Sequence, residues 1–215
     1  MAPPPLLTDM GQLRAAVDVL CAQRDITVLG VCGMAGAGKT TLCRMLLADR
    51  PGRAAHLECD LFSTRSHADR QARIARARAT GDAQAIHAEE DPQAWYDWAA
   101  IGRAICGLRQ DRACRWHHAW NRQTGELDAP LSVTLPRTGP ALLLCDCIYL
   151  LHDPVRGWMD GLLLVQAPDA VIANRRAERA GAPEALRRAR DRQERFERPY
   201  FDRYTARADL RLSLR

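Results

Sequence analysis

One short segment limits the folds open to this chain more than any other feature of its sequence. The run Gly33–Thr40, GMAGAGKT, matches the pattern G-x-x-x-x-G-K-[ST]. An apolar, β-branched run, Ile26–Cys32, precedes it, and a helix-forming run, Thr40–Leu47, follows it. A strand, a glycine-rich loop and a helix in this order form a binding site for phosphate at the helix N-terminus. The segment therefore predicts an α/β fold that binds a nucleoside triphosphate.

The chemistry of this loop needs the residue types that it contains. Glycines allow backbone N–H groups to curve around a phosphate. We expect Lys39, the only lysine of the protein, to reach the β- and γ-phosphates, and the Thr40 hydroxyl to ligate Mg²⁺. The predicted cofactors are therefore ATP and Mg²⁺, and a plain glycine-rich turn is the alternative. The residues predicted to contact the nucleotide here are Gly33, Ala35, Gly36, Ala37, Gly38, Lys39, Thr40 and Thr41.

Further apolar runs predict the rest of a central sheet. They cover residues 54–59, 141–145, 161–165 and, more briefly, 210–214. Because hydrophobic residues follow one another without alternation, these strands should be covered on both faces. We predict a doubly wound α/β fold with a mostly parallel five-stranded sheet between helices, in a single domain over residues 1–215.

Two segments interrupt the alternation of strand and helix. The first, residues 63–138, is too long to be a loop, and we expect it to form an inserted substrate-binding region. Within it, residues 65–79 and 92–108 have the pattern of helices, and residues 121–126 that of a turn or hairpin tip. The second, residues 175–192, consists of two arginine-rich helical stretches separated by a Gly-Ala-Pro break, which is typical of a lid.

Two aspartates follow predicted strands. Asp60 comes after the second strand and Asp146 after the third. Ligands bind beyond the carboxyl ends of the strands in parallel α/β sheets, so both carboxylates should lie near the phosphates. Asp60 can accept the proton of an attacking hydroxyl, and Asp146 suits a contact to Mg²⁺ through water. A capping or turn role is the alternative for each of them.

These motifs together resemble the uridine kinase and phosphoribulokinase-like family of P-loop kinases, over a stretch from Ile26 to about Leu212. The segment Asp60-Leu-Phe-Ser63 is similar to the family's aspartate followed by a spacer and Phe-Tyr, which implies that Asp60 is the catalytic base. The acidic residues Glu90 and Asp91, followed by proline, resemble the family's substrate-binding acids and imply contacts to the hydroxyls of the acceptor.

The resemblance extends to a substrate loop and a lid. The segment 116–122 is similar to the family's substrate loop, and the stretch 175–179 to its lid arginines. In the family, such arginines contact the triphosphate and neutralise charge during transfer. The resemblance implies substrate contacts from His117, Trp120 and Arg122, and nucleotide contacts from Arg176 and Arg179.

The chain departs from the family at two positions. Ser63 stands where nucleoside kinases commonly carry a tyrosine, which puts recognition of a pyrimidine in doubt. Asp146-Cys147 stands in place of the family's Glu-Gly at the end of the third strand, a conservative change of acid together with an unexplained loss of glycine.

Composition narrows the function further. The chain is 47% hydrophobic and 27% charged, has no apolar run long enough for a membrane span and starts without a signal-peptide pattern, so we expect a cytoplasmic protein. The net charge of +5 comes from arginines that alternate with acidic residues at helical spacing, so no nucleic-acid partner is predicted. The eight cysteines are scattered, and Cys145-Asp-Cys147 lacks the spacing of a zinc site, so we predict free thiols and no zinc.

We therefore predict an ATP-dependent phosphotransferase that moves the γ-phosphate to a hydroxyl of a small molecule, either nucleoside-like or another alcohol. Pantothenate, a sugar or a natural-product alcohol is the alternative acceptor on the same scaffold. A regulatory P-loop ATPase is the alternative from another functional class. A GTPase is disfavoured, because its Asn-Lys-x-Asp motif needs a second lysine. A membrane partner is not expected, and a homodimer is compatible with the sequence.

Overall fold

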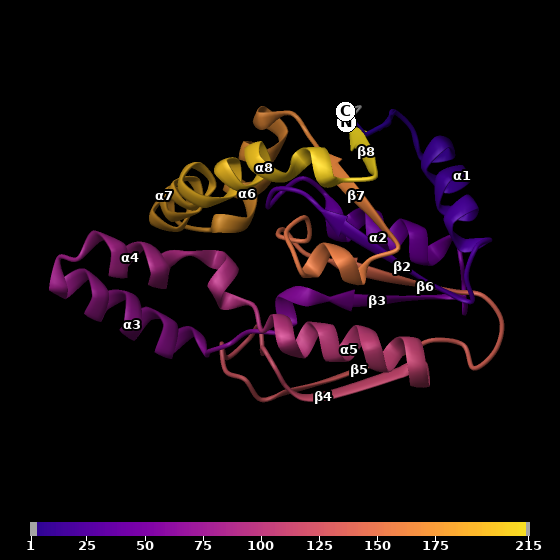
Figure 1. Cartoon of the computed structure of the whole chain (residues 1–215). Coiled ribbons are helices and arrows are strands. Elements are labelled where there is room, and N and C mark those ends of the chain that lie inside the picture. Colours follow the sequence, from indigo (N-terminus) through magenta and orange to yellow (C-terminus); the bar gives the residue numbers. More distant parts are fainter. Residues whose placement is uncertain (1–3, 214–215) are drawn as a thin grey trace. The chain divides into compact units, whose positions relative to one another are not determined.

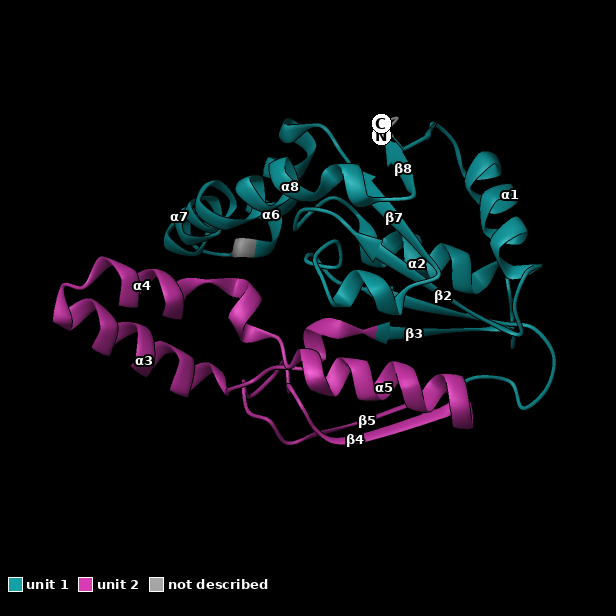
Figure 2. Cartoon of the chain, viewed as in Figure 1, with its two compact units in different colours: residues 1–57, 135–215 teal, residues 58–134 magenta. Residues whose placement is uncertain are grey.

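The computed structural model describes residues 4–213, so Leu214 of the last predicted strand lies outside the described residues. The chain divides into two compact units (Figure 2). Unit 1 combines residues 1–57 with residues 135–215, and unit 2 comprises residues 58–134. Figure 1 labels the helices and strands of both units.

Unit 1 is built on a six-stranded, mostly parallel sheet in the order β1-β8-β7-β2-β6-β3, which lies between helices. The prediction of an α/β fold is confirmed, but the predicted count of five strands is wrong. The additional strand, β1, has only two residues and pairs with β8 at the edge of the sheet, so its sequence is too short to show a pattern. The strands are β1 Leu6–Leu7, β2 Ile26–Cys32, β3 Ala54–Glu58, β6 Ala141–Asp146, β7 Gly161–Gln166 and β8 Leu210–Ser213.

The centre of this sheet explains why its strands read as continuous apolar runs. All seven residues of β2 and all six of β6 are buried. Strand β2 pairs in parallel with β6 on one side and with β7 on the other. A strand with neighbours on both sides and helices over both faces has no solvent-facing position, so polar residues do not alternate with apolar ones. The carboxyl end of β2 therefore leads the chain out of the middle of the sheet at Gly33.

The helices of unit 1 pack their apolar sides onto this sheet. Leu13 and Val17 of the first helix and Leu42 and Leu46 of the second belong to the main hydrophobic core together with side chains of the central strands. The helices are α1 Met10–Cys21, α2 Lys39–Ala48, α6 Asp169–Ala180, α7 Pro183–Arg192 and α8 Arg198–Tyr204. The predicted break between the two arginine-rich helices lies at Gly181, which ends α6 in a left-handed conformation with φ of 63°.

Unit 2 contains three helices and a hairpin: α3 His67–Thr80, α4 Ala83–Glu90, α5 Trp98–Asp111, β4 Ala113–Ala119 and β5 Ala129–Thr134. The predicted turn at 121–126 connects β4 and β5, which pair antiparallel. Instead of one helix over 92–108, a short 3₁₀ turn at Pro92–Trp95 precedes α5, because Asp97 accepts a hydrogen bond from the backbone of Ala100 and caps a new helix.

No helix among residues 4–213 is long and apolar enough to cross a membrane.

Candidate active site

The glycine-rich loop of unit 1 has backbone conformations that only glycine adopts without strain. Gly33, Gly36 and Gly38 have φ of 148°, 91° and 106°, in the region that side chains disfavour. A Cβ at Gly33 would lie 2.3 Å from the carbonyl oxygen of Val165, so the end of β7 leaves no room for one. Helix α2 begins at Lys39 with Gly38 as its N-cap and without a side-chain cap. The loop thus leads into a helix N-terminus, where backbone N–H groups can donate hydrogen bonds to a bound anion.

Lys39 folds back along this loop. Its ammonium donates hydrogen bonds to the carbonyl oxygens of Gly33, at 2.9 Å, and Met34, at 3.3 Å. The side chain is 9% exposed. These contacts hold the ammonium of the only lysine at the loop where the sequence pattern predicts phosphates. A lysine ammonium at such a site can act as a compact point charge.

Thr40 and Asp146, the two residues predicted to serve Mg²⁺, lie together. The Thr40 hydroxyl donates a hydrogen bond of 2.6 Å to Oδ2 of Asp146. Thr40 stands in the first turn of α2, and Asp146 ends β6, where it pairs with Val31 of β2. The Asp146 side chain is 8% exposed, and its Oδ2 also lies 3.7 Å from Nε2 of His56 on β3. A hydroxyl and a carboxylate at adjacent strand ends form a pair of hard oxygen donors.

A cleft of about 290 Å³ runs between the loop and helices α6 and α7. Its lining residues are Ala35, Gly36, Arg176, Arg179, Ala185, Ala189, Arg192 and Glu197. The predicted nucleotide ligands Arg176 and Arg179 therefore border the glycine-rich loop. Among residues 4–213, the exposed side chain of Arg179 makes no hydrogen bond or ion pair in the structure. The guanidinium of Arg176, in contrast, already donates hydrogen bonds within the protein.

Arg176 belongs to a buried network at the loop. Its guanidinium donates hydrogen bonds to the carbonyl oxygens of Ala35 and Ala189 and forms a 2.7 Å ion pair with Glu197. The same carboxylate accepts a 3.0 Å hydrogen bond from the backbone N–H of Ala35. Both side chains of the ion pair are 6% exposed. A buried pair with these additional hydrogen bonds joins the helix pair to the loop, and breaking it would leave a charge without compensation.

Two contacts to the loop were not predicted from the sequence: Glu197 was not identified, and Arg175 stood within the predicted lid stretch but was assigned no contact. Glu197 lies in a π-helical turn, Gln193–Glu197, and no motif marks it in the sequence. Arg175 donates hydrogen bonds to the carbonyl oxygens of Gly36 and Ala37, at 3.1 and 3.3 Å. The arginine-rich composition indicated a lid but did not show which guanidiniums contact the loop backbone.

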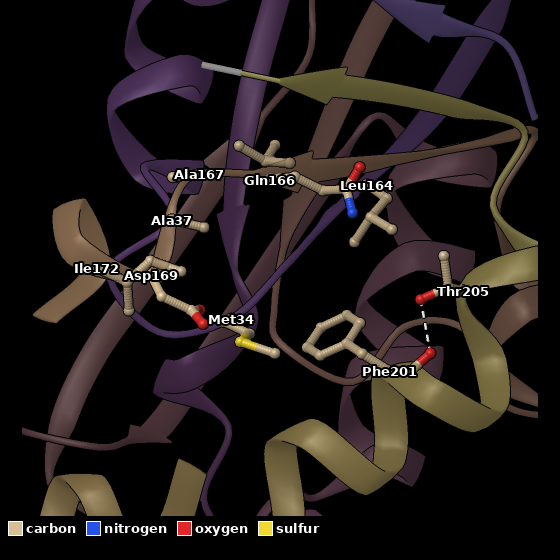
Figure 3. Close-up of a pocket in the computed structure, with 10 residues that line it drawn as sticks. Met34, Ala37, Leu164, Gln166, Ala167, Asp169, Ile172, Phe201 and Thr205 are labelled. Carbon is tan, nitrogen blue, oxygen red and sulfur yellow. Dashed lines mark hydrogen bonds between the residues drawn. The ribbon is translucent and has the colours of Figure 1, made fainter. Parts of the chain in front are cut away.

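A second cavity, of about 170 Å³, adjoins the loop at Met34 and Ala37 (Figure 3). Met34 and Phe201 point toward one another across it, and Ala37, Leu164 and Ile172 add further apolar surface. Because this lining is mainly hydrophobic and contains no arginine or lysine, it lacks the charge that a phosphate requires. The arginine-lined cleft is the better place for one.

In unit 2, the predicted base Asp60 has a partner that the sequence did not reveal. Oδ1 of Asp60 accepts a 2.8 Å hydrogen bond from the hydroxyl of Tyr96. Tyr96 forms a short antiparallel bridge with Ser63, and its ring stacks on Trp98 with the ring centroids 4.9 Å apart. The chain thus places a tyrosine from another segment opposite Ser63, where the resembled kinases carry a tyrosine in sequence.

The other predicted substrate residues of unit 2 have contacts of their own. Glu90 is 7% exposed and accepts a hydrogen bond from Arg78, while Asp91 caps the turn that follows it. Trp120 donates its indole N–H to the carbonyl oxygen of Gly125. The remaining two lie outside any buried network: Arg122 is exposed and paired with Glu58, and His117 is exposed on β4.

No protein-family model and no curated protein sequence matches the chain. Solved structures do. A protein described as a fructose transport system kinase from Silicibacter sp. TM1040 superimposes with a TM-score of 0.69 at 18% identity, over 95% of this chain and 99% of that one. A protein described as a possible uridine kinase from Bacillus stearothermophilus gives 0.56 at 18% identity, over 94% and 99%. Phosphoribulokinase from Rhodobacter spheroides gives 0.56 at 13% identity, over 84% and 68%.

Identities this low show a common fold and leave the reaction open. The chain has the fold of the uridine kinase and phosphoribulokinase-like P-loop kinases, as its motifs predicted. The names of these three proteins refer to different acceptors, so the fold is compatible with more than one substrate.

Proposed function

We propose that this protein is an ATP- and Mg²⁺-dependent phosphotransferase that transfers the γ-phosphate to a hydroxyl of a small molecule. The observation that supports it most is the convergence of Lys39, Thr40 and Asp146 at one glycine-rich loop. This loop supplies a helix N-terminus, an ammonium and a pair of oxygen donors, and phosphoryl transfer depends mainly on such positioning and charge stabilisation.

Each group of unit 1 has a distinct task in this proposal. The backbone from Gly33 to Thr41 binds the phosphates, and Lys39 leaves the carbonyls of its own loop to stabilise charge on the transferred group. Thr40 and Asp146 would hold Mg²⁺, which favours hard oxygen ligands and neutralises phosphate charge when bound. We assign the contact with the γ-phosphate to Arg179, which lines the cleft between the loop and helices α6 and α7, and we assign to Arg176 the role of maintaining the shape of the loop through Glu197.

Unit 2 supplies the groups for the acceptor. Asp60 acts as the general base, and the hydrogen bond from Tyr96 orients its carboxylate. We assign binding of the acceptor's hydroxyls to Glu90 or Asp91, with His117, Trp120 and Arg122 as further substrate contacts. The stacked pair of Tyr96 and Trp98 offers an aromatic surface near Asp60. This surface would supply part of the stacking area that Ser63 cannot provide.

The acceptor is either nucleoside-like or another alcohol such as pantothenate, a sugar or a natural product. A regulatory ATPase remains the alternative from a different class. None of the eight cysteines, all within residues 4–213, forms a disulfide in the structure, which suits a reducing compartment, and we retain the cytoplasm as the predicted location.

Release of ADP with a panel of acceptors tests this proposal. The panel contains uridine, cytidine, fructose, glycerate, pantothenate and amino alcohols, each with ATP·Mg²⁺ and with a no-acceptor control. We expect at least one hydroxyl acceptor to raise ADP release well above the control and to yield a phosphate monoester by mass spectrometry. ADP release that no acceptor changes, with free phosphate as the only product, would instead support the regulatory ATPase.

Replacing Arg179 with alanine should weaken binding of ATP more than binding of ADP. Charge-assisted hydrogen bonds from a guanidinium to the γ-phosphate are absent in the ADP complex, so only ATP loses them. We expect the Kd for ATP to rise by roughly tenfold, the equivalent of about 1.4 kcal/mol, and the Kd for ADP to change less. Isothermal titration calorimetry with both nucleotides measures the difference.

Arg188→Ala is the matched control. Arg188 lies on the adjacent helix α7, but its exposed side chain pairs with Glu184 and does not line the cleft. This variant should leave both Kd values near those of the wild type. Equal losses for ATP and ADP in Arg179→Ala, or equal effects in both variants, would reduce the role of Arg179 to general surface charge.

A further inference from the structure

Three side chains with different donor atoms converge between helix α2 and strands β3 and β6. They are Cys43 of α2, His56 of β3 and Asp146 of β6. One ligand atom of each, the sulfur, a ring nitrogen and a carboxylate oxygen, lies within 4.8 Å of the others. The Cys43 side chain is fully buried, and those of His56 and Asp146 are 11% and 8% exposed. All three belong to unit 1.

The fold brings these residues together for simple geometric reasons. Cys43 stands three residues after Thr40 on α2, so both lie on the same side of the helix. Asp146 ends β6, and β3, which carries His56, is the neighbour of β6 in the sheet. Helix and strands thus present their side chains to one small volume beside the Thr40 hydroxyl.

The donor set suits a different cation from Mg²⁺. Thiolate and imidazole ligands favour Zn²⁺ and its softer relative Cd²⁺, whereas Mg²⁺ requires oxygen ligands. A sulfur, a nitrogen and an oxygen donor would leave one position of a tetrahedral ion for water. Metal–ligand bonds of about 2.0 to 2.3 Å place tetrahedral donors roughly 3.3 to 3.8 Å apart. The three donors lie within 4.8 Å of one another, so binding would shorten the longest separation by as much as about 1 to 1.5 Å.

Charge also balances at this site. Binding of a divalent cation by neutral His56, ionised Asp146 and Cys43 releases the thiol proton to solvent, because the metal takes a thiolate. Two negative charges on the ligands then match the two positive charges of the ion. A cation and ligands with no net charge have the smallest free-energy cost of burial.

We propose that Cys43, His56 and Asp146 form a site for a thiophilic divalent cation, Zn²⁺ or Cd²⁺, that inhibits the protein by taking Asp146 away from Thr40. The inhibition rests on the proposed function, in which Thr40 and Asp146 hold Mg²⁺. The binding itself does not, because it depends only on the three donors.

Titration with Cd²⁺ alone tests the site directly. A cadmium–thiolate bond has a charge-transfer absorption in the ultraviolet, which reports the sulfur ligand independently of activity. We expect Cys43→Ser to lose this absorption at the tightest binding step. His56→Gln should raise the Kd of that step by at least about tenfold, since loss of a direct ligand should cost no less than loss of an outer-shell partner, for which tenfold is a common minimum. Proton release measured in weak buffer should fall in Cys43→Ser as well.

Cys106→Ser is the matched control, because Cys106 is exposed on α5 in unit 2. It should leave the tightest step unchanged. Cys32, the buried thiol of β2, should not compete, because among residues 4–213 it belongs to no cluster of three possible ligands as Cys43 does. Thermal melting followed by circular dichroism establishes that each variant is folded, and His56→Gln provides a second test if Cys43→Ser is not.

The outcomes separate the site from the proposed function. Unchanged cadmium absorption and Kd in both folded variants would overturn the site, whatever the activity of the protein. Loss of cadmium binding in the variants, together with an acceptor-dependent activity that Cd²⁺ inhibits at least tenfold less in Cys43→Ser than in the wild type, would establish both. Loss of binding in a protein with no phosphotransfer to any acceptor would keep the site and reject the proposed function.

Discussion

Replacing Lys39 with methionine should reduce phosphotransfer by at least about 10²- to 10³-fold, because the ammonium stabilises charge that develops on the transferred phosphate. Methionine keeps most of the length and apolar surface of the lysine stem, so the packing at the start of α2 should persist. Steady-state kinetics with the acceptor identified in the ADP-release panel measures the loss, and circular dichroism measures whether the fold is retained. Turnover like that of the wild type in the folded variant would reject the assignment of the phosphate-binding loop.

Chemical modification gives an independent test of the same residue. Lys39 is the only lysine, so an amine-reactive reagent can modify only this side chain and the N-terminal amine. Lys39 is 9% exposed and its ammonium donates to two loop carbonyls, so modification should be slow without nucleotide and slower still with ATP·Mg²⁺. Peptide mapping by mass spectrometry separates the two amines. The N-terminal amine serves as the internal control, and its labelling should not change with nucleotide.

Replacing Asp60 with asparagine should lower kcat by roughly 10²- to 10⁴-fold, the range for loss of a general base, with little change in the Kd for ATP. Asparagine has the same shape and can still accept the hydrogen bond from Tyr96, so the local structure should remain. Kinetics with the acceptor, and calorimetry with ATP, measure the two quantities. If binding of ATP is lost while turnover survives, Asp60 serves the metal or the structure instead of proton transfer.

Tyr96→Phe is the companion variant for this prediction. It removes the hydroxyl that donates to Asp60 but keeps the ring that stacks on Trp98. If the hydroxyl orients the base, kcat should fall by a smaller factor than in Asp60→Asn, and the KM for the acceptor should change little. The pH profile of kcat should also shift to higher pH, since loss of a hydrogen bond to the ionised carboxylate raises the pKa of Asp60.

The local sequence was sufficient to predict segments whose conformation depends on residues that are close together in the chain. The glycine-rich loop was predicted in full, because glycines at 33, 36 and 38 allow the positive φ angles that the loop has in the structure. The buried parallel strands were predicted because a strand without a solvent-facing side reads as a continuous apolar run. The helix pair around Gly181 followed from its break residues.

Prediction failed where local signals were weak. Strands β4 and β5 carry exposed, partly charged residues such as Arg115 and His117, so they lack the continuous hydrophobicity by which the other strands were found. The edge strand β1 has only two residues, and its pairing with β8 depends on a segment more than two hundred positions away. Local periodicity contains no information about such a partner.

The sequence by itself determined that this protein has a P-loop α/β fold and which residues form its glycine-rich loop, because a motif of this kind acts through backbone geometry within a few consecutive residues. Only the tertiary structure decided which side chains meet that motif from elsewhere. Glu197 reaches the N–H of Ala35 from a π-turn, Tyr96 reaches Asp60 from across a bridge, and Cys43, His56 and Asp146 meet from a helix and two strands. The physical reason is that contacts between residues distant in sequence depend on how helices and strands pack, and no spacing along the chain records that packing.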